Sequence, residues 1–395
     1  MNRLPRWGFW LVCFAGVVAF VSTDEAFAAD GWKAGAAKVV ITPTQPMWMS
    51  GYSGRDHAAE GKLHDLWAKA LAVEDPTGDR LVLITLDLVG IDRQLSLAVR
   101  ETLAKRHHLS TRQIAICCSH THTGPVVGKN LRAMYFLDDE QSKRVDAYSD
   151  ALEAKLIALV GEAIGKLAPA DLFWATSKAT FAVNRRENVE ADVPRLIAEG
   201  NLKGPVDHDV PVLAVRDKQG QLTAIVCGYA CHATVLSFFQ WSGDWPGFAQ
   251  IDLEKSHPGA IALFWAGCGA DQNPLPRREV ALAEKYGKEL AVSVEQALAG
   301  KMAPIAGRLA MSYAEIDLPL AKLPTTEELQ KQAASSDKYQ ASRAKLLLAQ
   351  IAGGKPLSQT YPYPVQIWRL GDGPVWVTLG GEVVVDFSLR IKQEL

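Results

Sequence analysis

The sequence has almost no excess of charge of either sign. Its 395 residues include 42 Lys and Arg against 44 Asp and Glu, which gives a formal net charge of −2. No run of lysines and arginines occurs along the chain. Because nucleic-acid binding depends on a concentrated basic surface, we expect no nucleic-acid partner.

Low-complexity segments, repeats of solenoid length and the serine-hydrolase motif Gly-x-Ser-x-Gly are also missing. A hydrophobic fraction of 48% with 22% charged residues is typical of a folded globular chain. These features exclude a solenoid, a disordered protein and a serine enzyme of the α/β-hydrolase type.

Long apolar runs are scarce, and the one that matters lies at the N-terminus. Residues 7–21 are apolar and follow two arginines, but the run is too short for a comfortable membrane span. Ala26-Phe-Ala28 supplies the small residues that a signal peptidase reads. We therefore expect residues 1–28 to be a signal peptide. The mature chain, residues 29–395, should have no transmembrane segment and be exported to the periplasm, the cell surface or the extracellular space.

Cysteine is scarce as well. Five of the six cysteines lie outside the expected signal peptide, and all five fall within apolar runs. We expect them to be small buried hydrophobic residues. An odd number in an oxidising compartment would leave at least one free thiol or an intermolecular bridge.

Strands alternate with helices along the chain, which is typical of an α/β fold. The predicted strands cover residues 38–43, 67–74, 81–87, 114–118, 173–183, 210–216, 222–231, 260–266, 308–318, 365–370 and 375–379. The predicted helices cover residues 92–107, 140–167, 279–299, 325–351 and a segment that begins near Gly380. That last helix has no stop signal before Leu395, so we expect the domain to be truncated at its C-terminal end.

Two histidines follow one of these strands directly. His120 and His122 occupy alternate positions, so in extended backbone both imidazoles face the same side. Imidazole is a preferred zinc ligand, and a strand fixes its direction. The pair alone is equally compatible with two polar residues in a loop.

Other strand ends carry further polar residues. His232 follows the strand at 222–231, a glycine-rich turn follows the strand at 260–266, and Glu382 follows the strand at 375–379. Ligands collect at the carboxyl ends of strands in open α/β sheets. Two histidines and a glutamate, with water in the remaining position, form a well-attested catalytic zinc shell that activates the water. The alternatives are a hydrogen-bonded core histidine for His232 and a helix-dipole contact for Glu382.

A haem site is a minor alternative. Cys227-Gly-Tyr-Ala-Cys231-His232 resembles a covalent c-type haem attachment with one extra spacer residue. The surrounding run is apolar enough to be a core strand, which favours zinc over haem.

Four separated motifs carry a family resemblance: Ser-His-Thr-His-Thr-Gly-Pro at 119–125, Ala-Cys-His-Ala-Thr at 230–234, Ser-Gly-Asp-Trp-Pro-Gly at 242–247 and the turn at 269–274. In this order they resemble the N-terminal catalytic domain of neutral/alkaline ceramidases, from about Gly35 to the end. The resemblance implies layered mixed β-sheets flanked by helices. It also implies a zinc amidohydrolase that cleaves the N-acyl bond of ceramide or of another small-molecule or lipid N-acyl substrate.

The resemblance also implies roles for individual residues. His120, His232 and Glu382 match the zinc ligands, His122 matches the active-site histidine beside the metal, and Arg185 matches an arginine of the substrate pocket. A tyrosine ligand and an immunoglobulin-like domain of the family would lie beyond the last residue of this sequence.

One departure concerns the family's Gly-Asp-Val-Ser-Pro-Asn loop, whose serine is important for activity. Aligning Asp271 and Pro274 with that loop places Asn273 at the serine position. Asparagine can donate a hydrogen bond to an oxyanion but cannot act as a nucleophile, so attack by zinc-activated water is favoured. The alternative is a non-catalytic zinc- or lipid-binding homologue.

Attack by water requires a nearby base. His122 is the first candidate because it shares a face with His120. Asp244 and Asp271, on two glycine-bounded loops, are the alternatives, although either could cap its own turn or orient a ligand imidazole.

Overall fold

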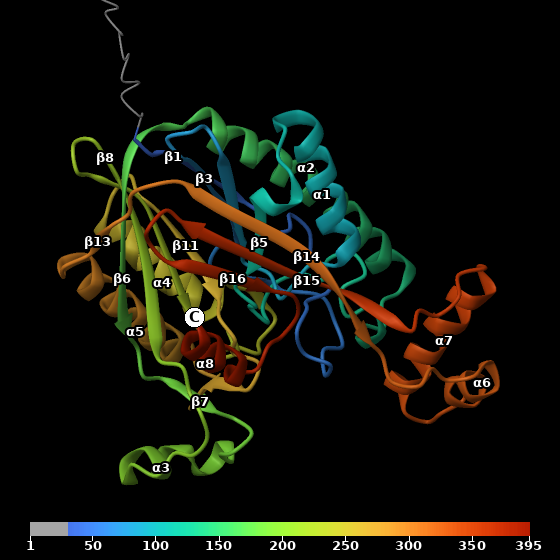
Figure 1. The fold of residues 1–395 in the computed structure, drawn as a ribbon. Helices are drawn as coiled ribbons and strands as arrows, with labels where there is room; N and C mark the ends of the chain where they lie inside the picture. The colour runs from blue at the N-terminus through green and yellow to red at the C-terminus, as the bar shows by residue number, and fades with distance from the viewer. Residues whose placement is uncertain (1–30) are drawn as a thin grey trace, which may run out of the picture.

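A computed structural model describes residues 31–395 (Figure 1), so the predicted signal peptide lies outside the described residues. Its main feature is a mixed nine-stranded sheet. The strands are β1 (Lys33–Val40), β3 (Trp67–Glu74), β4 (Arg80–Leu86), β5 (Ile114–Cys118), β6 (Ala168–Lys178), β8 (Asp209–Asp217), β9 (Leu222–Tyr229), β11 (Ile261–Ala266) and β13 (Ala303–Pro304). Their order is β11-β9-β8-β6-β1-β3-β4-β5, with β13 paired to β6.

The sheet folds back on itself between β1 and β6. Only two residue pairs join these strands, so the two halves of the sheet can diverge beyond that point. The strands β1, β3, β4 and β5 form one layer, and β6, β8, β9 and β11 form the other. Leu71 and Leu83 of the first layer share a buried core with Val226 and Leu263 of the second. Lys69 of β3 also donates a 2.7 Å hydrogen bond to the carbonyl of Ala262 on β11, which joins the layers directly.

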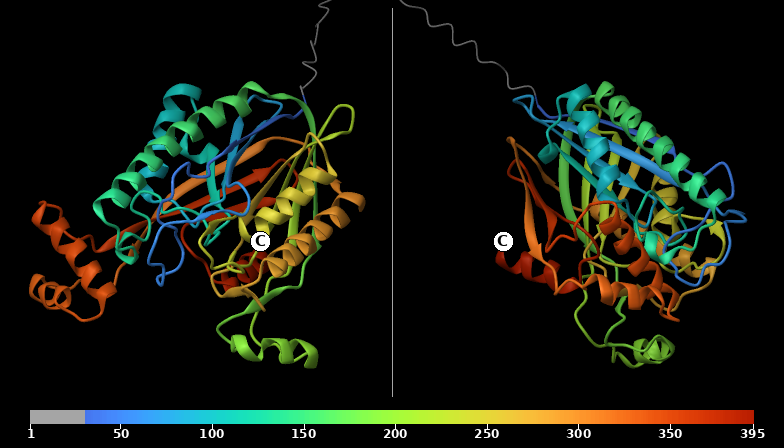
Figure 2. Two further views of the ribbon diagram at one scale, coloured as in Figure 1. Left: turned by 180° about the vertical axis from the view of Figure 1, so that it is seen from behind. Right: turned by 90° about the vertical axis from the view of Figure 1, so that its right-hand side faces the viewer.

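Helices cover the outer face of each layer (Figure 2). The helices α1 (Arg93–His107) and α2 (Asp139–Gly165) pack on the first layer, and α4 (Asp244–Ser256) and α5 (Val280–Ala299) pack on the second. Asp92 and Asp138 cap α1 and α2 by accepting backbone N–H groups through their side chains. The resulting order of helix, strand, strand and helix confirms the predicted α/β class.

A three-stranded sheet closes one side of the inter-layer core. It consists of β14 (Leu309–Pro319), β15 (Thr360–Leu370) and β16 (Val375–Leu379). Trp368 and Trp376 from this sheet belong to the inter-layer core. The helices α6 (Thr326–Ala333) and α7 (Lys338–Ala352) lie beyond the far end of the β14–β15 ribbon (Figure 1).

The remaining elements are short. They are β2 (Gly61–Lys62) paired with β10 (Gln240–Trp241), β7 (Ala182–Asn184) paired with β12 (Gln272–Pro274), α3 (Val193–Glu199), α8 (Val385–Glu394) and the 3-10 turns Thr111–Gln113, Arg132–Met134 and Glu190–Asp192. Within residues 31–395 no helix is both long and apolar enough to cross a membrane.

Two of the differences from the sequence prediction concern helices. The tight loop expected at residues 242–247 is instead the start of α4, because Pro246 lies in the first turn of a helix, where its missing N–H costs nothing. The single helix expected over residues 325–351 is divided into α6 and α7. The side chain of Asp337 accepts the N–H groups of Tyr339 and Gln340, which ends one helix and begins the next.

Candidate metal centre

The three histidines follow the ends of two strands that lie in different layers but end close together. His120 and His122 follow β5, and His232 follows β9. A bridge between Thr121 and Ala233 and a 3.2 Å hydrogen bond from His122 N to Ala233 O hold the two loops together. One ligand-capable atom from each histidine lies within 4.8 Å of the others, which makes the cluster a potential metal site.

Backbone carbonyls orient two of these imidazoles. The Nδ1 of His120 lies 2.7 Å from Val89 O, and the Nδ1 of His232 lies 2.7 Å from Gly269 O. A carbonyl only accepts hydrogen bonds, so in each ring Nδ1 carries a proton and Nε2 is the nitrogen that faces Glu382. This is how proteins usually fix a metal-binding histidine.

Glu382 completes the arrangement. Its Oε2 lies 3.3 Å from His232 Nε2 and 3.6 Å from His120 Nε2. The hydrogen bond with His232 lowers the pKa of Glu382 to about 2, although burial acts in the opposite direction. Glu382 lies in the loop before α8, which begins at Val385, and not in the first turn of a helix as the sequence suggested. A helix-dipole contact therefore does not explain its position.

These separations suit a zinc ion. Tetrahedral coordination with bonds of about 2.0–2.1 Å places neighbouring ligand atoms about 3.3 Å apart. The pairs described above are close to that value, as is the 3.1 Å between the Nε2 atoms of His120 and His122. The residues therefore fit zinc either as the predicted set of two histidines and Glu382 or as the three histidines.

His122 differs from the other two imidazoles. Its Nδ1 is buried and has no hydrogen-bond partner among the described residues, so no carbonyl orients it. Burial and the neighbouring His120 and His232 hold the pKa of His122 well below its usual value, which keeps the ring neutral at pH 7. A neutral imidazole beside the cluster is able to accept a proton.

No motif in the sequence identified the residues that support His122. Tyr52 packs edge-on against its ring with centroids 4.9 Å apart, and Arg55 Nη2 donates a 2.9 Å hydrogen bond to the carbonyl of His122. Gly51 has φ +97°, and a Cβ there would lie 2.5 Å from the imidazole. All three belong to the aromatic and glycine-rich loop at residues 48–55, which shows why that loop contains a glycine at this point.

Asp271 connects the other parts of the site. Its Oδ1 accepts the N–H of Val385 at 2.9 Å, beside the Glu382 loop, and its carbonyl accepts the N–H of Arg185 at 2.8 Å. Its Oδ2 lies 3.4 Å from Asn184 Nδ2. The carboxylate therefore holds neighbouring backbone in place, a role that the sequence left open beside that of a base.

Arg185 lies close enough to influence Glu382 electrostatically. Its Nη2 donates a 2.6 Å hydrogen bond to Ala270 O, whereas its Nε is buried without a partner among the described residues. Burial and the adjacent Arg186 lower the pKa of Arg185, although Glu382 opposes this. A donor of this kind can bind an oxyanion or a carboxylate.

Asn273 lies in the protein interior. It is 3% exposed on β12, and its Oδ1 accepts a long 3.5 Å hydrogen bond from Thr234 Oγ1, two residues from His232. The side-chain amide nitrogen remains available as a donor.

Asp244 has a structural position at the start of α4. It is fully buried with φ +54°, and its carboxylate accepts the N–H groups of Val235, Leu236 and Trp245. Burial raises the pKa of Asp244 to about 6 despite those hydrogen bonds. All of these contacts lie within the chain that follows His232, so Asp244 shapes that segment. It is not on the open loop that the sequence suggested.

The cysteines of the haem alternative lie in the apolar core. Cys227 and Cys231 are each 1% exposed and pack with the side chains beneath α4 and α5. His232 directs its ring towards Glu382. This arrangement leaves no exposed loop to which a haem could attach. All five described cysteines are free thiols; Cys227 and Cys231 are buried as expected, whereas Cys117, Cys118 and Cys268 are only partly buried.

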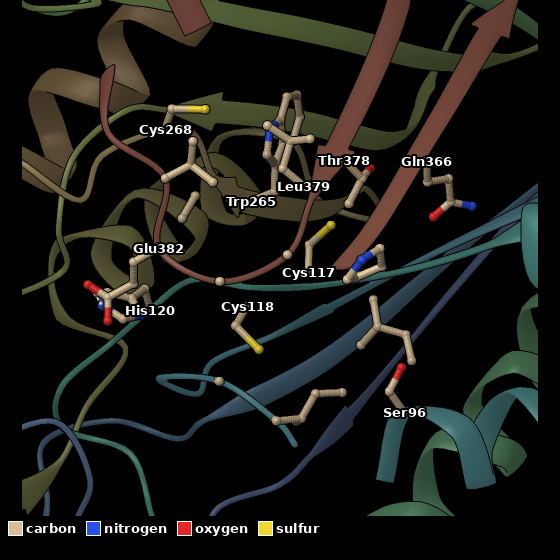
Figure 3. A pocket seen from close by; sticks show the side chains of 18 of the residues that line it. Ser96, Cys117, Cys118, His120, Trp265, Cys268, Gln366, Thr378, Leu379 and Glu382 are labelled. Carbon is tan, nitrogen blue, oxygen red and sulfur yellow. Dashed lines mark ion pairs between the residues drawn. The ribbon is translucent and has the colours of Figure 1, made fainter. Parts of the chain in front are cut away.

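A cavity of about 490 Å³ opens beside the cluster (Figure 3). His120, His232 and Glu382 form one end of it, and β5, α1, the end of β11 and β16 form its walls. The volume lies within the range of sites for small molecules and single lipid chains. His122, Arg185 and Asn273 do not line it.

Comparison with known proteins identifies one family. The model of the family described as neutral/alkaline non-lysosomal ceramidase, N-terminal, matches residues 32–308. Every predicted site residue except Glu382 lies within that range.

Individual relatives are distant. Neutral ceramidase 1 of Arabidopsis thaliana is 26% identical over 292 residues, which cover 70% of this chain and 37% of that protein. Neutral ceramidase of Oryza sativa subsp. japonica is 24% identical over 275 residues, covering 68% and 33%. The matches span about a third of the length of these relatives. The structure of neutral ceramidase from Pseudomonas aeruginosa superposes with a TM-score of 0.70 over 92% of this chain and 64% of that one, at 20% identity, which shows a shared fold.

Proposed function

Since the chain belongs to the neutral/alkaline non-lysosomal ceramidase family, we propose that it is a zinc-dependent hydrolase that cleaves the N-acyl amide bond of a lipid-like substrate. The observation that carries this proposal is the pair of imidazoles whose Nδ1 atoms bind backbone carbonyls while both Nε2 atoms face Glu382. Such an arrangement is characteristic of a metal site, and a purely structural core does not require it.

His120, His232 and Glu382 would hold the zinc ion, which when bound would lower the pKa of a water molecule towards neutrality. His122, neutral and beside the cluster, would accept the proton of that water at an imidazole nitrogen. Arg185 and Asn273 offer donors for the developing oxyanion or for the carboxylate product. The cavity beside Glu382 gives the apolar acyl part a place to bind.

The test combines metal analysis with a hydrolysis screen. Purified protein should contain about one zinc ion per chain, and His232→Ala should lose it. The screen covers N-acyl lipids, N-acyl amino acids and simple esters, before and after chelation. Turnover of an N-acyl substrate that is lost with the chelator and restored by zinc supports the proposal. A metal-free, fully folded wild-type protein would contradict it.

A second candidate is a non-catalytic zinc- or lipid-binding homologue. Asn273 favours it, because the family's serine is replaced at this position. This candidate predicts zinc binding and lipid binding without turnover on any substrate of the screen. Zinc-dependent turnover would eliminate it.

We also propose that the protein is exported, because residues 1–28 have the composition of a signal peptide. Fractionation of cells that express the full chain should place the protein outside the cytoplasm. The N-terminal residue of the purified protein should then be Ala29.

A further inference from the structure

The cavity has a second polar region at the end away from the metal centre. Figure 3 shows Ser96 and Gln366 on the side opposite His120 and Glu382. Between the two ends the lining is mostly apolar or thiol, and includes Ile116, Cys117, Cys118, Trp265 and Leu379. The cavity therefore has a polar end, an apolar middle and a second polar end.

Arg100 of α1 provides the charge in that second region. Its Nε donates to Ser96 Oγ at 3.2 Å, and its Nη1 donates to the carbonyls of Thr111 and Ile114 at 2.9 and 2.6 Å. Its guanidinium lies 5.7 Å from the centre of the Tyr313 ring. Burial lowers the pKa of Arg100. Among the described residues no carboxylate forms an ion pair with Arg100, and its Nη2 donates no hydrogen bond.

A neighbouring arginine shows the contrast. Arg93 also lines the cavity, but Glu315 binds it through two hydrogen bonds of 2.8 Å. Glu315 therefore binds Arg93 directly, whereas it acts on Arg100 only through a longer-range electrostatic attraction. A buried charge without a directly bound counterion is costly, and a ligand carboxylate would supply one.

The distance between the two polar ends follows from β5. Arg100 binds the carbonyl of Ile114 at the start of this strand, and the metal centre follows Cys118 at its end. Four steps along a strand span about 13 Å, which is the length of β5 alone, and His120 lies two residues beyond its end. An extended chain covers the same distance with roughly twelve bonds.

We propose that the cavity binds an acyl chain of about this length that carries a carboxylate at its far end, and that Arg100 binds this carboxylate. The proposal rests on the proposed hydrolase function, because the scissile amide would lie at the metal centre while the far end of the acyl chain reaches Arg100. Arginine is suited to this role, since its planar guanidinium matches a carboxylate in geometry and charge. The apolar middle of the cavity accommodates the methylene groups.

The experiment compares two amides with the same leaving group and about twelve chain atoms, one ending in a carboxylate and one in a methyl group. Wild-type protein should prefer the carboxylate-ended amide. Arg100→Gln should lower its kcat/KM by roughly 10- to 100-fold, mainly through KM, and lower that of the methyl-ended amide far less. Arg106→Gln, which removes the same charge from an exposed position on α1, should not alter the preference.

Two results would overturn the inference. An equal loss on both amides would show that Arg100 only supports the turn at residues 111–114. A wild-type preference for the methyl-ended amide would show that the far region repels anions. If Arg100→Gln unfolds, Arg100→Lys keeps the charge and should retain part of the preference for the carboxylate.

A binding measurement separates this inference from the proposed function. Calorimetry with a dicarboxylate and a monocarboxylate of equal length should show tighter binding of the dicarboxylate to the wild type and similar binding of both to Arg100→Gln. If that pattern appears without turnover of either amide, the hydrolase proposal fails and the inference stands. If the methyl-ended amide is hydrolysed and the dicarboxylate binds no more tightly than the monocarboxylate, the hydrolase proposal stands and the inference about Arg100 fails.

Discussion

Replacement of Asp271 by asparagine distinguishes a residue that positions the site from one that accepts a proton in the reaction. The Asp271 side chain is 4% exposed and accepts the N–H of Val385, three residues after the proposed ligand Glu382. A hydrogen bond to a charged acceptor contributes about 1.5–3 kcal/mol, against about 0.5–1.5 kcal/mol for a neutral one. Asparagine keeps the acceptor oxygen but loses the charge, so if this bond holds the Glu382 loop in its binding position, zinc binding should weaken about 10-fold.

The measurement is a competitive titration of zinc against a chelator of known affinity, with Asp146→Asn as the control. Asp146 is exposed on α2, so its substitution removes the same charge far from the loop. Asp271→Asn should bind zinc more weakly and recover turnover when zinc is in excess. A variant that keeps wild-type zinc affinity but loses turnover would refute this reasoning and identify Asp271 as the base.

Four other substitutions have defined outcomes. His122→Ala should keep zinc and lose most of its turnover. Asn273→Ala should lower turnover by at most ~10²–10³-fold, the effect of removing one oxyanion donor. Wild-type turnover in zinc-loaded His122→Ala would show that another group is the base. Leu263→Ala, at 0% exposure between the two layers, should lower the free energy of unfolding by about 2–5 kcal/mol in urea titrations, and a change below about 1 kcal/mol would contradict the layered core. Burial raises the pKa of Asp207, but hydrogen bonds from Lys392 and Ser388 outweigh it and the net pKa is lowered. The stabilisation from the Asp207 carboxylate is therefore present above the unfolded carboxyl pKa of about 3.9 and is lost as the pH falls through the pKa of Asp207 in the folded protein. Asp207→Asn should lower the free energy of unfolding at pH 7 and have little effect at pH 2. Equal effects at both pH values would count against the ion pair with Lys392.

The sequence predicted the residues that approach the candidate metal centre better than the contacts that hold them in place. His120, His122 and His232 could be placed because each follows an apolar strand, and the strands Trp67–Glu74 and Ile114–Cys118 have the predicted bounds. Such runs are local signals, and the carboxyl ends of strands are where polar residues of a site collect.

The parts that could not be predicted depend on contacts between distant segments. The fold-back of the sheet at β1 and β6 rests on two residue pairs with no local pattern. The carbonyl of Val89 orients His120, and any residue type provides a carbonyl, so no side-chain signal marks that position. The sequence places Asp244 in a loop because Gly243 and Pro246 are common in turns, although both residues are also compatible with the start of a helix.

The backbone of His120 limits how this site can be altered. Its φ of +61° lies in the left-handed region, where side chains with a Cβ are disfavoured and asparagine and glycine are tolerated best. An alanine at this position would remove the imidazole and also leave a strained backbone without the hydrogen bond to Val89 that helps to hold it. Asparagine is therefore the better choice for a metal-free reference protein. In a library of variants, a metal-free chain that remains folded should arise most readily through asparagine or glycine at position 120.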